Sequence, residues 1–223
     1  MQSQEPRKVG EITLFEFSVV IAANFNNPAI LNPDFLRYNK IVDNQYEVND
    51  SPITTPAFSQ VKFNNGISVT STPDQLVFQQ IRDELNSNEI CSPSIAMRYL
   101  KCVPHVSYSA VGINPKGYSV NRSENHVLNM LREGGSWITF KDTSPTVTLK
   151  TAYDFGGRKI ALEISESHQL TASKNITGTV FQANFHHESK GQNVGSRIKH
   201  LNSILESWNR DLIEFFVLVD KYC

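Results

Sequence analysis

The stretch FSQVKFNNGISVTSTPDQLVFQQ, residues 58–80, decides the fold class of this chain. Apolar and polar residues alternate on both sides of Asn65-Gly66, as they do in strands that bury one face. A two-residue turn at Asn65-Gly66 would place Phe63 opposite a polar residue and mix the two faces. A three-residue loop with Gly66 in the left-handed region places Phe63 opposite Ile67 and keeps one face apolar, so the sequence predicts a strand register of this kind.

The other elements follow from alternation, turn residues and helix caps. Glu11–Phe25 alternates like a long strand, and Val147–Phe155 with Arg158–Ser165 predicts a hairpin closed by Gly156-Gly157. Helices are expected to start at Asn32-Pro33 and at Ser92-Pro93, where a capping residue precedes proline. The remaining predicted elements are a turn at Thr72–Asp74, a strand at Val106–Ile113, a turn at Asn114–Gly117, a helix at Ser123–Leu131, strands at Trp137–Phe140 and Ile176–Phe185, and a long helix from about Asn193 to Val219.

These elements predict an α+β fold in a single domain, residues 1–223. We expect a mainly antiparallel sheet of meanders and hairpins, with helices packed on one face and a long C-terminal helix. The triplet Ala-Asn-Phe closes the strands that end at Phe25 and Phe185, and each strand is followed by a helix. This similarity suggests two related halves, residues 11–103 and 105–219.

Composition bounds the environment and the partners of the chain. There are 21 Lys and Arg residues against 22 Asp and Glu residues, a net charge of -1, which gives no strong nucleic-acid or membrane signal. The N-terminal residues are polar, and no apolar run approaches the ~18 residues of a membrane helix. Cys91 and Cys102 flank a predicted helix, too far apart to bridge. We therefore expect reduced thiols and a cytoplasmic protein.

The order of the meander, the Tyr108–Ile113 strand and the Leu201–Val219 helix resembles that of a family of sporadically distributed, uncharacterised bacterial proteins. The resemblance covers most of the chain. It implies a bacterial cytosolic origin, and the family offers no activity or catalytic residues to carry over.

Histidines are the best candidates for a metal site. His186 and His187 are adjacent in a strand and point to opposite faces, so that only one of them can join His200 of the following helix. A metal site needs three or four convergent ligands, and Cys102 with His105 supplies only one further pair. Surface or capping roles for these histidines are the simpler interpretation.

Three hypotheses of function remain. The chain lacks a G-x-S-x-G elbow and phosphate-binding glycine loops, and Asp154-Phe155-Gly156 stands without the other kinase motifs. The leading hypothesis is therefore a non-enzymatic binding or interaction protein without a cofactor, whose partner is a protein or a small molecule. The alternatives are a small-ligand carrier, with a cavity between a curved sheet and the C-terminal helix, and a metal-assisted enzyme.

The C-terminal helix also bears on partners. Its apolar residues recur at intervals of three and four and must be covered by an apolar surface. We expect the chain's own sheet to cover them, and the alternative is a homodimer through this helix. The stripe consists of Ile198, Leu201, Leu205, Trp208, Leu212 and Phe216.

Overall fold

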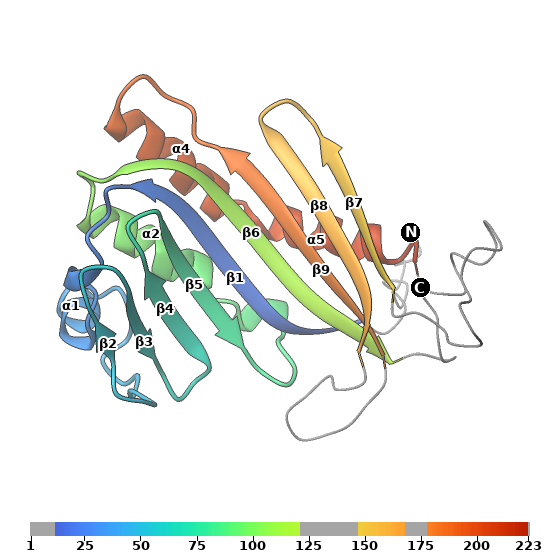
Figure 1. The fold of residues 1–223 in the computed structure, drawn as a ribbon, viewed down its shortest axis with the longest axis horizontal. Coiled ribbons are helices and arrows are strands. Elements are labelled where there is room, and N and C mark those ends of the chain that lie inside the picture. Colours follow the sequence, from blue (N-terminus) through green and yellow to red (C-terminus); the bar gives the residue numbers. More distant parts are fainter. Residues whose placement is uncertain (1–11, 121–146, 168–177, 223) are drawn as a thin grey trace, which may run out of the picture.

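A computed structural model describes residues 12–120, 147–167 and 178–222 (Figure 1). Nine strands form one antiparallel sheet in the order β2-β3-β4-β5-β1-β6-β9-β8-β7. The strands are β1 (Thr13–Asn24), β2 (Ile53–Thr54), β3 (Ser59–Lys62), β4 (Ile67–Ser71), β5 (Gln75–Ile81), β6 (Ser107–Val120), β7 (Thr148–Asp154), β8 (Arg158–Ser167) and β9 (Gly178–Glu188). The helix at Ser123–Leu131 and the strand at Trp137–Phe140 lie outside the described residues.

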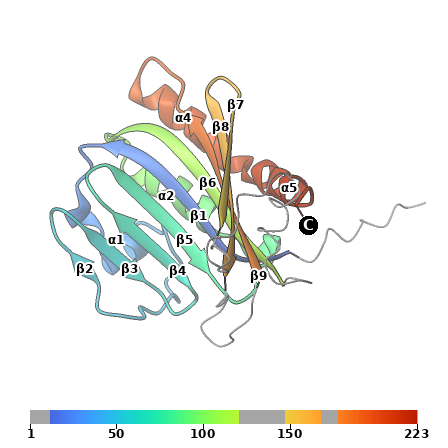
Figure 2. The same cartoon turned by 45° about the vertical axis from the view of Figure 1, so that its right-hand side comes forward.

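Helices cover one face of this sheet, and the views in Figures 1 and 2 agree on this arrangement. The helices are η1 (Pro28–Ile30), α1 (Pro33–Tyr38), η2 (Ser87–Glu89), α2 (Ser92–Cys102), α4 (Val194–Glu206) and α5 (Trp208–Val219). The predicted α+β class is confirmed. None of the helices in the described ranges is both long and apolar enough to cross a membrane.

The meander adopts the predicted register. The Phe63 N–H donates to the Ile67 carbonyl at 2.8 Å, and Val61 pairs with Val69. Gly66 has φ +82°, in the left-handed region that glycine adopts without a steric penalty. The alternating pattern therefore buries Val61, Phe63, Ile67 and Val69 on the helix-covered side.

The β7–β8 hairpin also has the predicted register. Gly156 and Gly157 both have positive φ, at +65° and +92°, as a two-residue turn of this hand requires. Tyr153 pairs with Ile160, and Asp154 pairs with Lys159 at an N–O distance of 3.9 Å. Because the two charged side chains are exposed, this ion pair contributes little to stability.

The turn predicted at Asn114–Gly117 is wrong, because β6 continues to Val120 between β1 and β9. Pro115 lies opposite Phe17 of β1, while no residue pair joins Asn114 or Pro115 to β9. The missing N–H of proline therefore falls at a gap in the β6–β9 ladder, where it is tolerated. Gly117 is needed because Ile12 lies close to it and not because of a turn: an added Cβ would lie 2.9 Å from the Ile12 Cγ2 atom.

The ends of β1 depart from the simple alternation. Phe17 and its neighbours on the same face are fully buried, as expected. A register shift between Leu14 and Glu16 turns Leu14 into the core and leaves Phe15 half-buried. Phe25 was expected on the core face, but it lies past the strand end with φ +59° and is 98% exposed.

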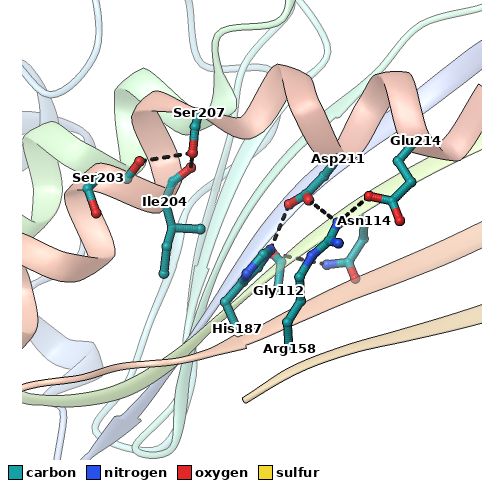
Figure 3. Close-up of polar contacts among 9 residues, drawn as sticks. All are labelled: Gly112, Asn114, Arg158, His187, Ser203, Ile204, Ser207, Asp211 and Glu214. Atoms are coloured by element: carbon teal, nitrogen blue, oxygen red, sulfur yellow. Dashed lines mark hydrogen bonds and ion pairs between the residues drawn. The ribbon is translucent and has the colours of Figure 1, made fainter. Parts of the chain in front are cut away.

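The C-terminal helix is not continuous. It breaks at Ser207, whose φ and ψ are -102° and 15°, and α4 and α5 follow one another with a change of direction (Figure 3). The Ser207 hydroxyl donates to the carbonyls of Ser203 and Ile204, at 3.0 and 3.1 Å. Such back-bonding competes with the helical ladder and bends helices. The break shifts the buried positions, so that Phe215 and Val219 are fully buried alongside Leu212.

Trp208 packs on the chain's own sheet, with its ring centroid 5.2 Å from that of Phe17 in an edge-to-face arrangement. We expect Trp208→Ala to lower the free energy of unfolding by about 2 kcal/mol, independently of protein concentration, because this half-buried ring loses its packing. Chemical denaturation at two protein concentrations measures the change. Dissociation of a dimer to a folded monomer would instead favour the subunit-interface alternative.

The sheet order bears on the proposed halves. The first strand of each segment pairs with the last, β1 with β5 and β6 with β9, and β1 and β6 meet at the centre of the sheet. However, the matching Ala-Asn-Phe triplets lie on β1 and β9, which open one segment and close the other. The triplets are thus not equivalent positions, and a true repeat stays a prediction.

Candidate ligand-binding surface

The structure places the predicted metal candidates on β9 and α4. His187 points to the helix-covered face, and His186 points to the opposite face of β9, as their adjacency predicted. His200 lies on α4, where its Nδ1 accepts the Lys190 N–H at 3.1 Å. Burial, followed by electrostatic interactions with Lys190 and His187, lowers the pKa of His200. In the described ranges no three His, Cys, Asp or Glu side chains gather to hold a metal ion.

His187 instead belongs to a polar cluster between the sheet and α5 (Figure 3). Its Nε2 lies 2.7 Å from Asp211 Oδ2, and the Asp211 side chain is only 7% exposed. The Arg158 guanidinium donates to Asp211 Oδ1 at 2.7 Å and to Glu214 Oε2 at 2.6 Å. One cation of β8 thus joins two carboxylates of α5 to the sheet.

Electrostatic interactions in this polar cluster hold α5 against the sheet. Burial opposes the charge of Arg158, but the hydrogen bonds that the guanidinium donates to Glu214 and Asp211 outweigh burial and raise its pKa. His187 and Asp211 resemble the base and orienting acid of a catalytic triad. Within the described part of the chain, no hydroxyl or thiol bonds to His187. The cluster therefore supports packing of α5 better than nucleophilic catalysis.

The helices leave the opposite face of the sheet uncovered (Figure 2). The strand registers place small or polar side chains in a row across this face. We call this set the central row, because its members lie side by side on successive strands from β4 to β7. The central row consists of Ser68, Gln79, Ser18, Asn114, Asn184, Ala161 and Ala152.

Gly112 makes room at the middle of the central row. A Cβ on Gly112 would lie 3.3 Å from Asn184 Oδ1, closer than most such contacts, and 3.5 Å from Asn114 Nδ2, at an ordinary contact distance. The Asn114 amide also reaches the Gly112 carbonyl, at 3.5 Å. The missing side chain therefore lets two amide groups of neighbouring strands lie over one backbone position.

Charges flank the central row in neutralised pairs. Lys116 lies 4.0 Å from Glu16, Lys150 lies 2.8 Å from Glu163, and Lys159 lies near Asp154 as described above. The Gln79 amide adds a hydrogen bond to Glu16 at 2.7 Å. Each of these three lysines has an acidic neighbour, so none of them is an unpaired cation of the kind that binds a phosphate backbone.

Strand β9 presents unused hydrogen-bonding groups on this face. Among the described residues, the side chains of Gln182, Asn184 and His186 have no hydrogen-bond partner. They stand beside the exposed alanines Ala161 and Ala152. Two open depressions of about 350 and 370 Å³ share Ala152, Ala161 and Asn184 as their floor, and one has Gln182 in its wall while the other has His186.

Sequence reasoning identified His186 but not its neighbours. Alternation along β9 places Gln182 and Asn184 on the same face as His186, so the sequence of this strand alone could have identified these three residues as neighbours. Ala152 and Ala161 could be joined to them only through the β7–β8 and β8–β9 registers. The chain has no match among the family models and curated proteins that were searched, and its resemblance to uncharacterised bacterial proteins stays a prediction.

Proposed function

We propose that this chain is a non-enzymatic binding protein whose ligand lies on the uncovered face of the sheet, over β7, β8 and β9. The observation that carries the proposal is the set of unpartnered side chains on β9, Gln182, Asn184 and His186, next to an alanine floor. Because water reaches these side chains, a ligand can replace water at their donors and acceptors without breaking a hydrogen bond within the protein.

The chemistry of these groups favours an uncharged ligand rich in hydroxyl groups, of the carbohydrate class. Side-chain amides offer both donors and acceptors, and a neutral imidazole offers one of each, which matches alternating hydroxyl groups. The adjoining lysines are neutralised by acidic neighbours, so an anionic ligand gains little there. The methyl groups of Ala152 and Ala161 leave space for a ring to approach the sheet.

We expect Ala161→Phe to weaken binding of a neutral oligosaccharide at least tenfold, because the new ring fills the floor shared by both depressions. Phenylalanine suits a strand, so the fold should be retained. The measurement is a screen of neutral oligosaccharides, followed by calorimetric titration of the best ligand with the wild type and the variant.

Thr148→Phe is the matched control, because Thr148 is an exposed residue of the same hairpin that lines neither depression. Its affinity should equal that of the wild type. Equal affinity in Ala161→Phe, or no binding of any neutral oligosaccharide by the wild type, would contradict the proposal.

The two alternative hypotheses have less support. A carrier would need a cavity between the sheet and the C-terminal helices. Side chains occupy this interface instead, including Trp208, which packs on Phe17, and the buried Leu205 and Phe215. A metal-assisted enzyme requires ligands to converge, whereas His186 and His187 diverge. Cytoplasmic location, bacterial origin and a homodimer through the C-terminal helix stay predictions.

A further inference from the structure

A separate cavity of about 520 Å³ lies where β1 ends, between the chain that follows β1 and the C-terminal end of α2. Phe25 and Phe35 provide aromatic rings, and Asn26, Asn27 and His105 provide polar groups. No Lys, Arg, Asp or Glu is among its lining residues. Cys102 also lines it, and burial raises the pKa of this thiol, which keeps it uncharged. The cavity thus suits a neutral ligand.

Phe25 is held at this cavity in an unfavourable backbone conformation. Its φ of +59° is rare for a bulky residue, and its side chain is almost wholly exposed. The flanking residues fix it, since Ala23 N–H donates to the Asp74 carbonyl at 2.8 Å and Asn26 N–H donates to the Pro73 carbonyl at 3.0 Å. A strained backbone conformation that does not serve to bury the side chain is typical of a functional position.

Asn26 leaves an acceptor unused beside the same cavity. The residue is 4% exposed, and its Nδ2 donates to Ser71 Oγ at 2.7 Å and to the Thr72 carbonyl at 3.1 Å. A carbonyl can only accept, so the amide orientation is fixed. Its Oδ1 is buried and has no partner among the described residues. Because Oδ1 is sealed from solvent, a ligand in the cavity cannot contact it, and Asn26 instead fixes the chain next to Phe25.

We propose that this cavity binds an uncharged planar ring with a hydrogen-bonding edge, of the nucleobase class. Asparagine amides pair with the donor and acceptor edge of adenine, and phenylalanine rings stack on base faces. Phe25 supplies an exposed ring at the cavity, and the exposed residues Asn24 and Asn27 supply amides. The inference concerns a site distinct from the uncovered sheet face and does not rest on the proposed function.

Calorimetric titration with adenosine tests the proposal, with ribose as the ligand that lacks the ring. We expect the wild type to bind adenosine and not ribose. Phe25→Gly should reduce adenosine affinity at least tenfold, while its melting temperature equals or exceeds that of the wild type, because glycine adopts positive φ freely. This combination separates a binding role from a structural role.

Phe155→Ala is the control for loss of an exposed phenylalanine, since Phe155 lies on the β7–β8 turn away from this cavity. It should bind adenosine like the wild type, as should Ala161→Phe. The inference is overturned if the wild type does not bind adenosine, if ribose binds equally well, if Phe25→Gly retains full affinity, or if Phe25→Gly lowers the melting temperature markedly.

Discussion

Replacing Gly66 by valine is expected to lower the free energy of unfolding by about 4 kcal/mol or more. Two costs add at this position. The backbone has φ +82°, which a β-branched residue resists. A Cβ would also overlap the Ile81 carbonyl oxygen. This backbone atom cannot move away easily, because the Ile81 N–H donates to the Gly66 carbonyl at 3.0 Å.

Gly156→Val separates these two costs. Gly156 has a similar φ of +65°, but no atom lies within 4 Å of the position that a Cβ would take. Only the conformational cost applies there, about 1–2 kcal/mol. Urea denaturation of both variants measures the difference. Equal losses in the two variants would show that the close approach of Ile81 to Gly66 does not contribute.

Local chemistry explains why the two hairpin registers could be predicted. At Gly66 and at Gly156-Gly157, the turn residues and the alternation of the flanking strands agree on one register. β6 could not be predicted in the same way, because Pro115 is acceptable only where the ladder to β9 has a gap. That gap depends on a neighbour which follows more than 60 residues later in the chain.

The break at Ser207 illustrates a second limit. An unbroken apolar stripe predicts a continuous helix, and serine is compatible with a helix interior. The observed break shifts the buried face of α5 and brings Asp211 toward His187 and Arg158. Neither partner shows a local signal for this contact, since Arg158 follows a hairpin turn and His187 ends a strand. The candidate surface is likewise assembled from three strands.

Arg158→Met is expected to lower the free energy of unfolding by about 3 kcal/mol, because removing one partner of a buried ion pair leaves the other charge uncompensated. Asp211 is 7% exposed, and without the guanidinium it would lie near a second carboxylate, Glu214, with His187 as its remaining partner in the described structure. The guanidinium carbon also lies 5.5 Å from the centroid of the Phe185 ring, so the loss includes this cation–π contact, while methionine retains much of the apolar stem.

A double-mutant cycle with Asp211→Asn tests this explanation. Asparagine keeps an oxygen that can accept from His187 but removes the buried negative charge. If the uncompensated carboxylate causes the loss, Asp211→Asn should recover about 1–2 kcal/mol when it is added to Arg158→Met. Urea denaturation of the wild type, both single variants and the double variant gives the coupling. Additive losses would mean that Arg158 stabilises the contact between α5 and the sheet without its bond to Asp211, through its contacts with Glu214 and Phe185, and the explanation by an uncompensated Asp211 carboxylate would be wrong.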